Sequence, residues 1–173
     1  MAISTFDGPV RSLGGMYNQG PNNMLTLAAT VTLDPAIHGG KIALVPATCA
    51  ITLPAIVATA YPASSGPGAD PNSTNNLGVE YRLFFNVISA GATAQTIVTG
   101  AAAGADKLVG ELIVSGTTTM GFASVTGTTI TLNATTTGGA ARGSMITLIP
   151  LAANLWSVNG VLIGSGSVAT PFS

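Results

Sequence analysis

Histidine and cysteine, two residue types that often carry catalysis or bind metals, occur once each in this chain, as His38 and Cys49. A nucleophile–histidine–acid set would depend on His38, but two glycines follow it, which is typical of a turn residue. No serine lies in the Gly-x-Ser-x-Gly pattern of a nucleophile elbow. A single cysteine excludes an internal disulfide and a multi-cysteine zinc site, so we expect Cys49 to be a small buried apolar residue.

Carboxylates are the remaining candidates for acid–base chemistry. Four of them could in principle be brought together by folding: Asp70, Glu80, Asp106 and Glu111. The chain has six acidic and five basic residues, and such groups more often pair on the surface. The polar loop at 62–76 has side-chain oxygens at alternate positions, but it lacks the glycine and the closing glutamate of a calcium loop. We therefore predict no enzymatic activity, no metal and no cofactor.

The charge content excludes two classes of partner. Charged residues make up 6% of the chain and the net charge is −1, whereas a typical soluble protein has about 25% charged residues. Five scattered cations cannot form a phosphate-binding patch or a polybasic membrane face, so we expect neither nucleic acid nor membrane as a partner. A surface with so little charge is poorly suited to a free monomer. We expect much of it to be covered by further copies of the chain or by another protein.

The long uncharged run at 42–69 is not a membrane span. Four prolines interrupt it, and prolines at that spacing would break a helix repeatedly: Pro46, Pro54, Pro62 and Pro67. The first seven residues contain no cationic segment followed by an apolar run, which argues against a signal peptide. Two short strands and a loop are the better interpretation of 42–69.

The elements must be organised around Leu77–Ile88, which holds three of the eight Phe and Tyr residues. Tyr81, Leu83 and Phe85 share one face of this strand because side chains alternate with a period of two, and Glu80 and Arg82 share the other. Further strands are expected at Leu25–Leu33, Lys41–Val45, Ala50–Leu53, Gln95–Thr99, Lys107–Ser115, Thr117–Val125, Thr128–Leu132, Ser144–Pro150 and Asn154–Ile163.

The fold class follows from this pattern. No stretch has sustained helical periodicity, and about eight to eleven short strands separated by turn signals predict an all-β protein. We expect an antiparallel β-sandwich or barrel without internal repeats, with Trp156 buried in its core. Lys107–Ser115 has little polarity on either face of the expected strand.

The chain is expected to have two parts, an N-terminal arm and a β domain. Residues 1–23 have too many glycines and prolines for a regular element, yet they carry large apolar side chains, so they are predicted to be an extended docking arm. Residues 24–173 are predicted to be a single β domain. The candidate residues for contact with a capsid or a sister subunit all lie in the arm: Phe6, Arg11, Leu13, Met16 and Tyr17.

Short motifs over most of the chain carry a family resemblance. They are 6–15 (Phe-Asp-Gly-Pro-Val-Arg-Ser-Leu-Gly-Gly), Leu25–Leu33 with His38-Gly39-Gly40 after it, 51–54 (Ile-Thr-Leu-Pro), Gly78–Tyr81 leading into Phe84–Val87, and Leu155–Gly160. The arrangement resembles the small β-rich decoration, or cement, proteins of tailed-bacteriophage capsids. The resemblance implies a homotrimer that binds the phage major capsid protein on the outer capsid surface and bridges neighbouring capsomers. It also implies synthesis in the cytoplasm of the bacterial host.

Other functions remain open at this point. A head-fibre, tail-fibre or other host-contacting virion module would have aromatic or acidic recognition sites at loop tips, and few are visible. An enzyme would need a polar pocket with perturbed ionisable groups. A bacterial surface adhesin would need a signal peptide.

Overall fold

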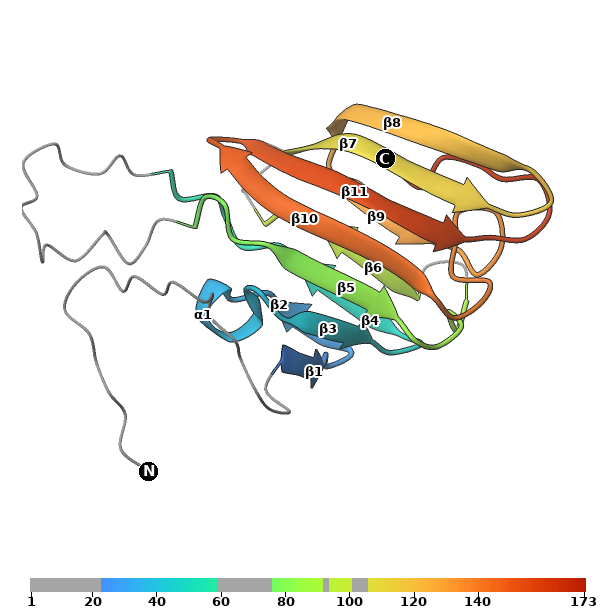
Figure 1. Ribbon diagram of the computed structural model, residues 1–173, viewed down its shortest axis with the longest axis horizontal. Coiled ribbons are helices and arrows are strands. Elements are labelled where there is room, and N and C mark those ends of the chain that lie inside the picture. The colour runs from blue at the N-terminus through green and yellow to red at the C-terminus, as the bar shows by residue number, and fades with distance from the viewer. Residues whose placement is uncertain (1–22, 59–75, 92–93, 101–105) are drawn as a thin grey trace, which may run out of the picture.

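The protein is a β-rich, two-layered molecule (Figure 1). The structure is a computed structural model that describes residues 23–58, 76–91, 94–100 and 106–173. Eleven strands and one four-residue helix make up its regular elements within these ranges. The predicted β class is confirmed. In the described part of the chain, no helix has both the length and the hydropathy needed to cross a lipid bilayer.

The strands form two sheets. The larger sheet has the order β1 (Met24–Thr26), β3 (Ile42–Val45), β5 (Tyr81–Phe85), β10 (Ser144–Ala152), β11 (Leu155–Ile163), β7 (Lys107–Ser115) and β8 (Thr119–Gly127). The smaller sheet has the order β2 (Thr30–Thr32), β4 (Cys49–Thr52), β6 (Gln95–Val98) and β9 (Thr129–Leu132).

The first six strands wind like a solenoid. Odd-numbered strands lie in the larger sheet and even-numbered strands in the smaller one, so β1–β2, β3–β4 and β5–β6 each form one coil. Successive coils pair in parallel in both sheets. The expectation of an antiparallel fold is therefore wrong for this half of the chain. A parallel pair needs a long connection between its strands, and the crossing to the opposite sheet supplies that connection.

The second half is mainly antiparallel. β10 pairs antiparallel with both β5 and β11, β8 pairs antiparallel with β7, and β9 pairs antiparallel with β6. One parallel pair, β7 with β11, joins these hairpins and makes the larger sheet mixed. Gly110 lies at an irregularity in the pairing of β7 with β8 and has a φ of 143°. A Cβ at this position would overlap the carbonyl oxygen of Val158, so glycine is required there.

The predicted strand Leu25–Leu33 is in fact two strands. β1 and β2 lie in different sheets, and the chain crosses between the layers after Thr26. The alternation of apolar residues continues through the crossing because the inner side of both sheets faces the same core, where Leu27 and Leu33 are buried.

The predicted turn at His38 contains a short helix, α1 (Pro35–His38). Asp34 caps its N-terminus, since Oδ1 accepts hydrogen bonds from the N–H groups of Ala36 at 2.7 Å and Ile37 at 3.2 Å. Proline is favoured at the first helical position because its missing N–H would be unsatisfied there in any case. Gly39 follows as the C-cap residue.

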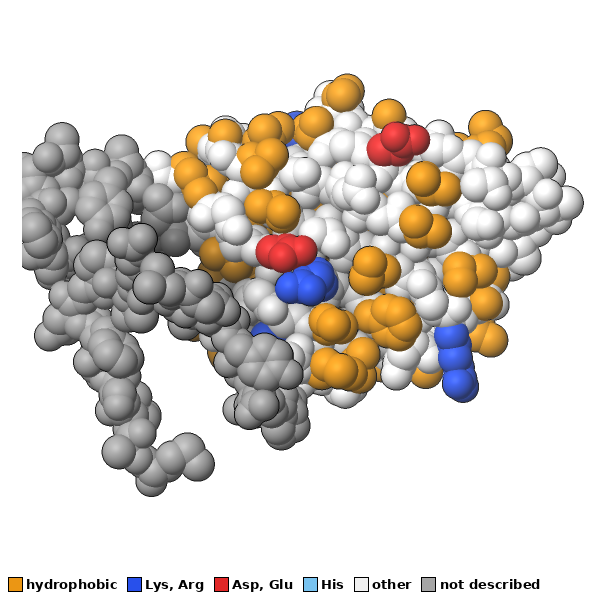
Figure 2. Space-filling model, viewed as in Figure 1, with side chains coloured by type: hydrophobic (Ala, Val, Ile, Leu, Met, Phe, Trp, Pro, Cys, Tyr) orange, Lys and Arg blue, Asp and Glu red, His pale blue; other side chains and the backbone are white. Residues whose placement is uncertain are grey.

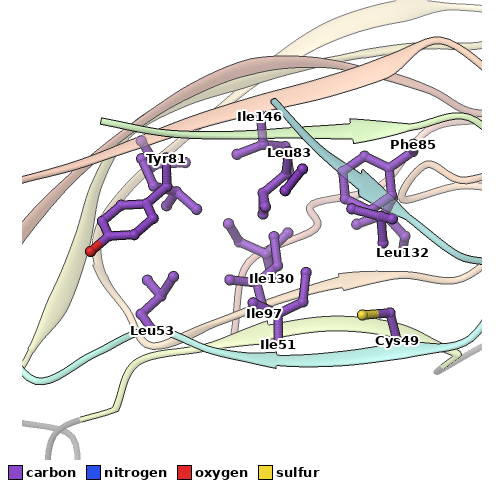
Figure 3. Packing of buried hydrophobic residues seen from close by; sticks show 14 of the residues in the cluster. Cys49, Ile51, Leu53, Tyr81, Leu83, Phe85, Ile97, Ile130, Leu132 and Ile146 are labelled. Atoms are coloured by element: carbon purple, nitrogen blue, oxygen red, sulfur yellow. The ribbon is translucent and has the colours of Figure 1, made fainter. Parts of the chain in front are cut away.

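The core lies between the sheets and is apolar (Figure 3). Tyr81, Leu83 and Phe85 of β5 point toward residues of the smaller sheet such as Ile51 and Ile97, as the period of two predicts. Trp156 is also fully buried, and its ring centroid lies 5.8 Å from that of Tyr81. Both predictions, the inward face of β5 and the burial of Trp156, are confirmed.

Candidate interaction surface

The residues that could do chemistry are held in structural contacts. The N–H of Asp34 donates to Nδ1 of His38 at 2.8 Å, which ties the histidine to its own helical turn. The Cys49 thiol is buried, as expected, and donates to the carbonyl oxygen of Ala28 at 3.1 Å. Burial raises the pKa of this thiol to about 11, so it is protonated at neutral pH. Among the described residues, no three His, Cys, Asp or Glu side chains are grouped to hold a metal ion.

The candidate carboxylates are dispersed rather than paired. Glu80 forms an ion pair with Arg82, with Oε1 3.4 Å from Nε. Asp106 is buried, and its Oδ2 accepts a hydrogen bond from the N–H of Ile56 at 3.4 Å. Glu111 is exposed on β7 and stands three strands from Arg82 in the same cross-strand row, a distance of about 14 Å. Asp70 lies outside the described residues.

A more notable feature is an apolar row across the outer face of the larger sheet. The strand registers align five residues from five neighbouring strands, which we call the outer stripe: Leu44, Phe84, Met145, Val161 and Ile113. The last three are exposed, at 46%, 48% and 40% of their surface. Figure 2 shows apolar side chains spread over this face and few charged ones.

The neighbouring row on the same face is mostly polar. It aligns Arg82, Thr147, Asn159 and Glu111, two residues along each strand from the stripe. Both members of the Glu80–Arg82 ion pair are 40% exposed, so solvent weakens their attraction and they contribute little to stability. The polar row gives the apolar stripe a border of side chains that can form hydrogen bonds. Protein interfaces have a similar arrangement, with an apolar centre and a polar rim.

The outer face is therefore a broad surface suited to contact with another protein. The stripe crosses four strand spacings, about 19 Å, and the longest strands measure about 30 Å. An exposed apolar row with a polar border on a soluble protein commonly marks an interaction site.

The sequence prediction placed the contact residues elsewhere. Phe6, Arg11, Leu13, Met16 and Tyr17 all lie outside the described residues. The outer stripe was missed because its members are far apart in the sequence and become neighbours only through the strand registers. One signal was present, since the low polarity on both faces of β7 includes Ile113 of the stripe.

Comparison of the chain with protein-family models, with curated proteins and with solved structures finds no match.

Proposed function

We propose that this protein is a structural virion protein, a capsid decoration or cement protein that binds the outer surface of a tailed-phage capsid. In this proposal it acts as a homotrimer whose partner is the major capsid protein, and it stabilises the junctions between capsomers. It would be made in the cytoplasm of the bacterial host and reside on the outside of the virion. The resemblance of its sequence motifs to such proteins is the starting point.

The observation that supports the proposal most strongly is the outer face of the larger sheet. A row of apolar side chains lies open there, and half-exposed residues such as Met145 and Val161 still have surface to bury. Burial of apolar area is the main source of association free energy between proteins. The small number of charges in the chain favours a partner that covers this face over one that is held by ionic contacts.

The protein would stabilise the shell by binding across the junction between capsomers. A packed genome pushes the shell outward, and a protein that binds only the intact junction adds its binding free energy to the closed state. The outer stripe would provide the rigid contact, because a seven-stranded sheet positions its side chains with little conformational freedom to lose.

The proposed arm at 1–23 would provide the second contact. Phe6, Leu13, Met16 and Tyr17 are apolar anchors, and Arg11 can form a charge-assisted hydrogen bond to a carboxylate or carbonyl of the partner. Deletion of residues 2–20 should leave the β-rich circular dichroism spectrum intact and weaken attachment to capsids or cohesion of the trimer. A truncated protein that unfolds would refute the docking role, and one that stays trimeric and binds with full affinity would show that the arm does neither job.

The test of the function is reconstitution on capsids of the parent phage that lack the protein. Purified protein should cosediment with these capsids up to a fixed ratio and raise the temperature at which they break open. Tail assemblies and whole host cells, added separately, serve as alternative partners. Binding to host cells or tails without binding to capsids would overturn the proposal in favour of a host-contacting module.

A further inference from the structure

The free edge of β8 is the second unusual surface of the molecule. β8 is the last strand of the larger sheet (Figure 1) and pairs with β7 along one side only. In the described part of the chain, no segment pairs with its other side. A strand in this position presents a row of unpaired N–H and C=O groups that can pair with another strand.

The other sheet edges are protected. β1 and β2 contain three residues each, too few to offer a long template. The edge of β9 is covered by the C-terminal segment, because the N–H groups of Thr129 and Thr131 donate to the carbonyl oxygens of Ser173 and Pro171, both at 2.9 Å. β8, with nine residues, is therefore the one long open edge among the described strands.

β8 lacks two of the usual devices that prevent edge pairing, a charge and a proline, and its pairing with β7 is irregular only between Ser124 and Gly127. Its residues are Thr-Met-Gly-Phe-Ala-Ser-Val-Thr-Gly, without a charge or a proline. Val125 is 71% exposed and Met120 is 50% exposed, so apolar side chains flank the open backbone.

We propose that β8 pairs antiparallel with β8 of a second copy of the chain, around a two-fold axis. A second β8 is the only described edge strand that matches its length, since the alternatives have three or four residues. An isologous contact of this kind uses the same surface on both subunits. The contact joins the two larger sheets edge to edge. Because Ile113 of the stripe pairs with Gly121 of β8, the row that contains the stripe reaches the new contact, and the outer face continues across the dimer.

Electrostatics permits this pairing. The β8 strands themselves carry no charge, so no like charges face each other across the new ladder. The nearest acidic group in the cross-strand row is Glu111 on β7, opposite Ala123. The Glu111 carboxylate lies over Gly121 of β8, and with Ala123 of one copy opposite Ala123 of the other the two Gly121 residues are about 14 Å apart, which exceeds the screening length of about 8 Å at physiological ionic strength.

Sedimentation velocity over a range of concentrations tests this inference in the full-length protein. The wild type should show a reversible two-fold step, either monomer to dimer or, if the proposed trimer forms, trimer to a pair of trimers. Val125→Lys should weaken that step by roughly tenfold or more, because a lysine on an edge strand loses hydration when another strand pairs beside it. Ile88→Lys, at an exposed apolar position in the segment after β5, is the control and should associate like the wild type.

Hydrogen exchange on the wild type provides an independent measurement. Amides on the open side of Thr119–Gly127 should exchange more slowly as the concentration rises, while those of Met24–Thr26 should not change. Absence of a two-fold step, equal association of Val125→Lys and wild type, or β8 amides that stay unprotected would each overturn the inference. None of these results bears on capsid binding, which is measured separately.

Discussion

The outer stripe makes a quantitative prediction for capsid binding. The triple substitution Ile113→Thr, Met145→Gln and Val161→Thr replaces its three exposed members with polar side chains of similar shape. All three point away from the core, and surface substitutions of this kind usually change the free energy of unfolding by less than about 0.5 kcal/mol each. The variant should therefore fold like the wild type while offering a polar face to the partner.

The magnitude follows from the exposed fractions. Complete burial of a large aliphatic side chain contributes about 1.5–3 kcal/mol, and these three side chains have 40–48% of their surface left to bury. Each would then contribute about 0.7–1.4 kcal/mol to binding, or roughly 2–4 kcal/mol together. Since each 1.4 kcal/mol is a factor of ten, the Kd for capsids should rise by roughly 30- to 700-fold.

The assay is cosedimentation of labelled protein with undecorated capsids over a concentration series. The control variant carries Ile37→Thr, which removes exposed apolar surface of the same kind from helix α1, at 55% exposure. The control should bind like the wild type. Equal Kd values for the triple variant and the wild type, with both folded, would refute the assignment of the outer face as the binding surface.

Three further predictions concern the core. Trp156→Ala should lower the free energy of unfolding by about 3–5 kcal/mol, measured by urea denaturation, and native fluorescence as red-shifted as that of free tryptophan would contradict its burial. Cys49 should stay unreactive toward Ellman's reagent at pH 8 until the protein unfolds, because burial raises its pKa to about 11. Burial, with a smaller effect of Asp34, raises the pKa of Tyr81 to about 12. Between about pH 10 and pH 12 the tyrosine therefore ionises in the unfolded chain but not in the folded one. The free energy of unfolding should fall by roughly 2–3 kcal/mol as the pH rises through this range. A Tyr81→Phe variant with the same loss would show that another group is responsible.

Local side-chain alternation was enough to predict the buried face of β5. Tyr81, Leu83 and Phe85 have a strict period of two in β5, and all three are buried. β7 was predicted at its observed bounds although neither of its faces is markedly polar, and the hairpin strands around Trp156 were predicted within two residues. Alternation reports which side of a strand faces the core, and this is decided by local sequence.

Strand partners could not be predicted in the same way. Alternation is identical in parallel and antiparallel strands, and it persists when the chain crosses to the facing sheet, as between β1 and β2. The solenoid repeat was hidden by unequal spacing, because Met24 pairs with Ile42 but Ile42 pairs with the much more distant Arg82. The outer stripe depends on these registers, so it too emerges only from the fold.

An electron cryomicroscopy reconstruction of the parent phage particle tests the central claim most directly. We predict density for this chain on the outer surface of the shell at capsomer junctions, with the face that carries Phe84, Met145 and Val161 turned toward the major capsid protein. Density at a fibre or tail tip, or on the shell with that face turned to solvent, would contradict it.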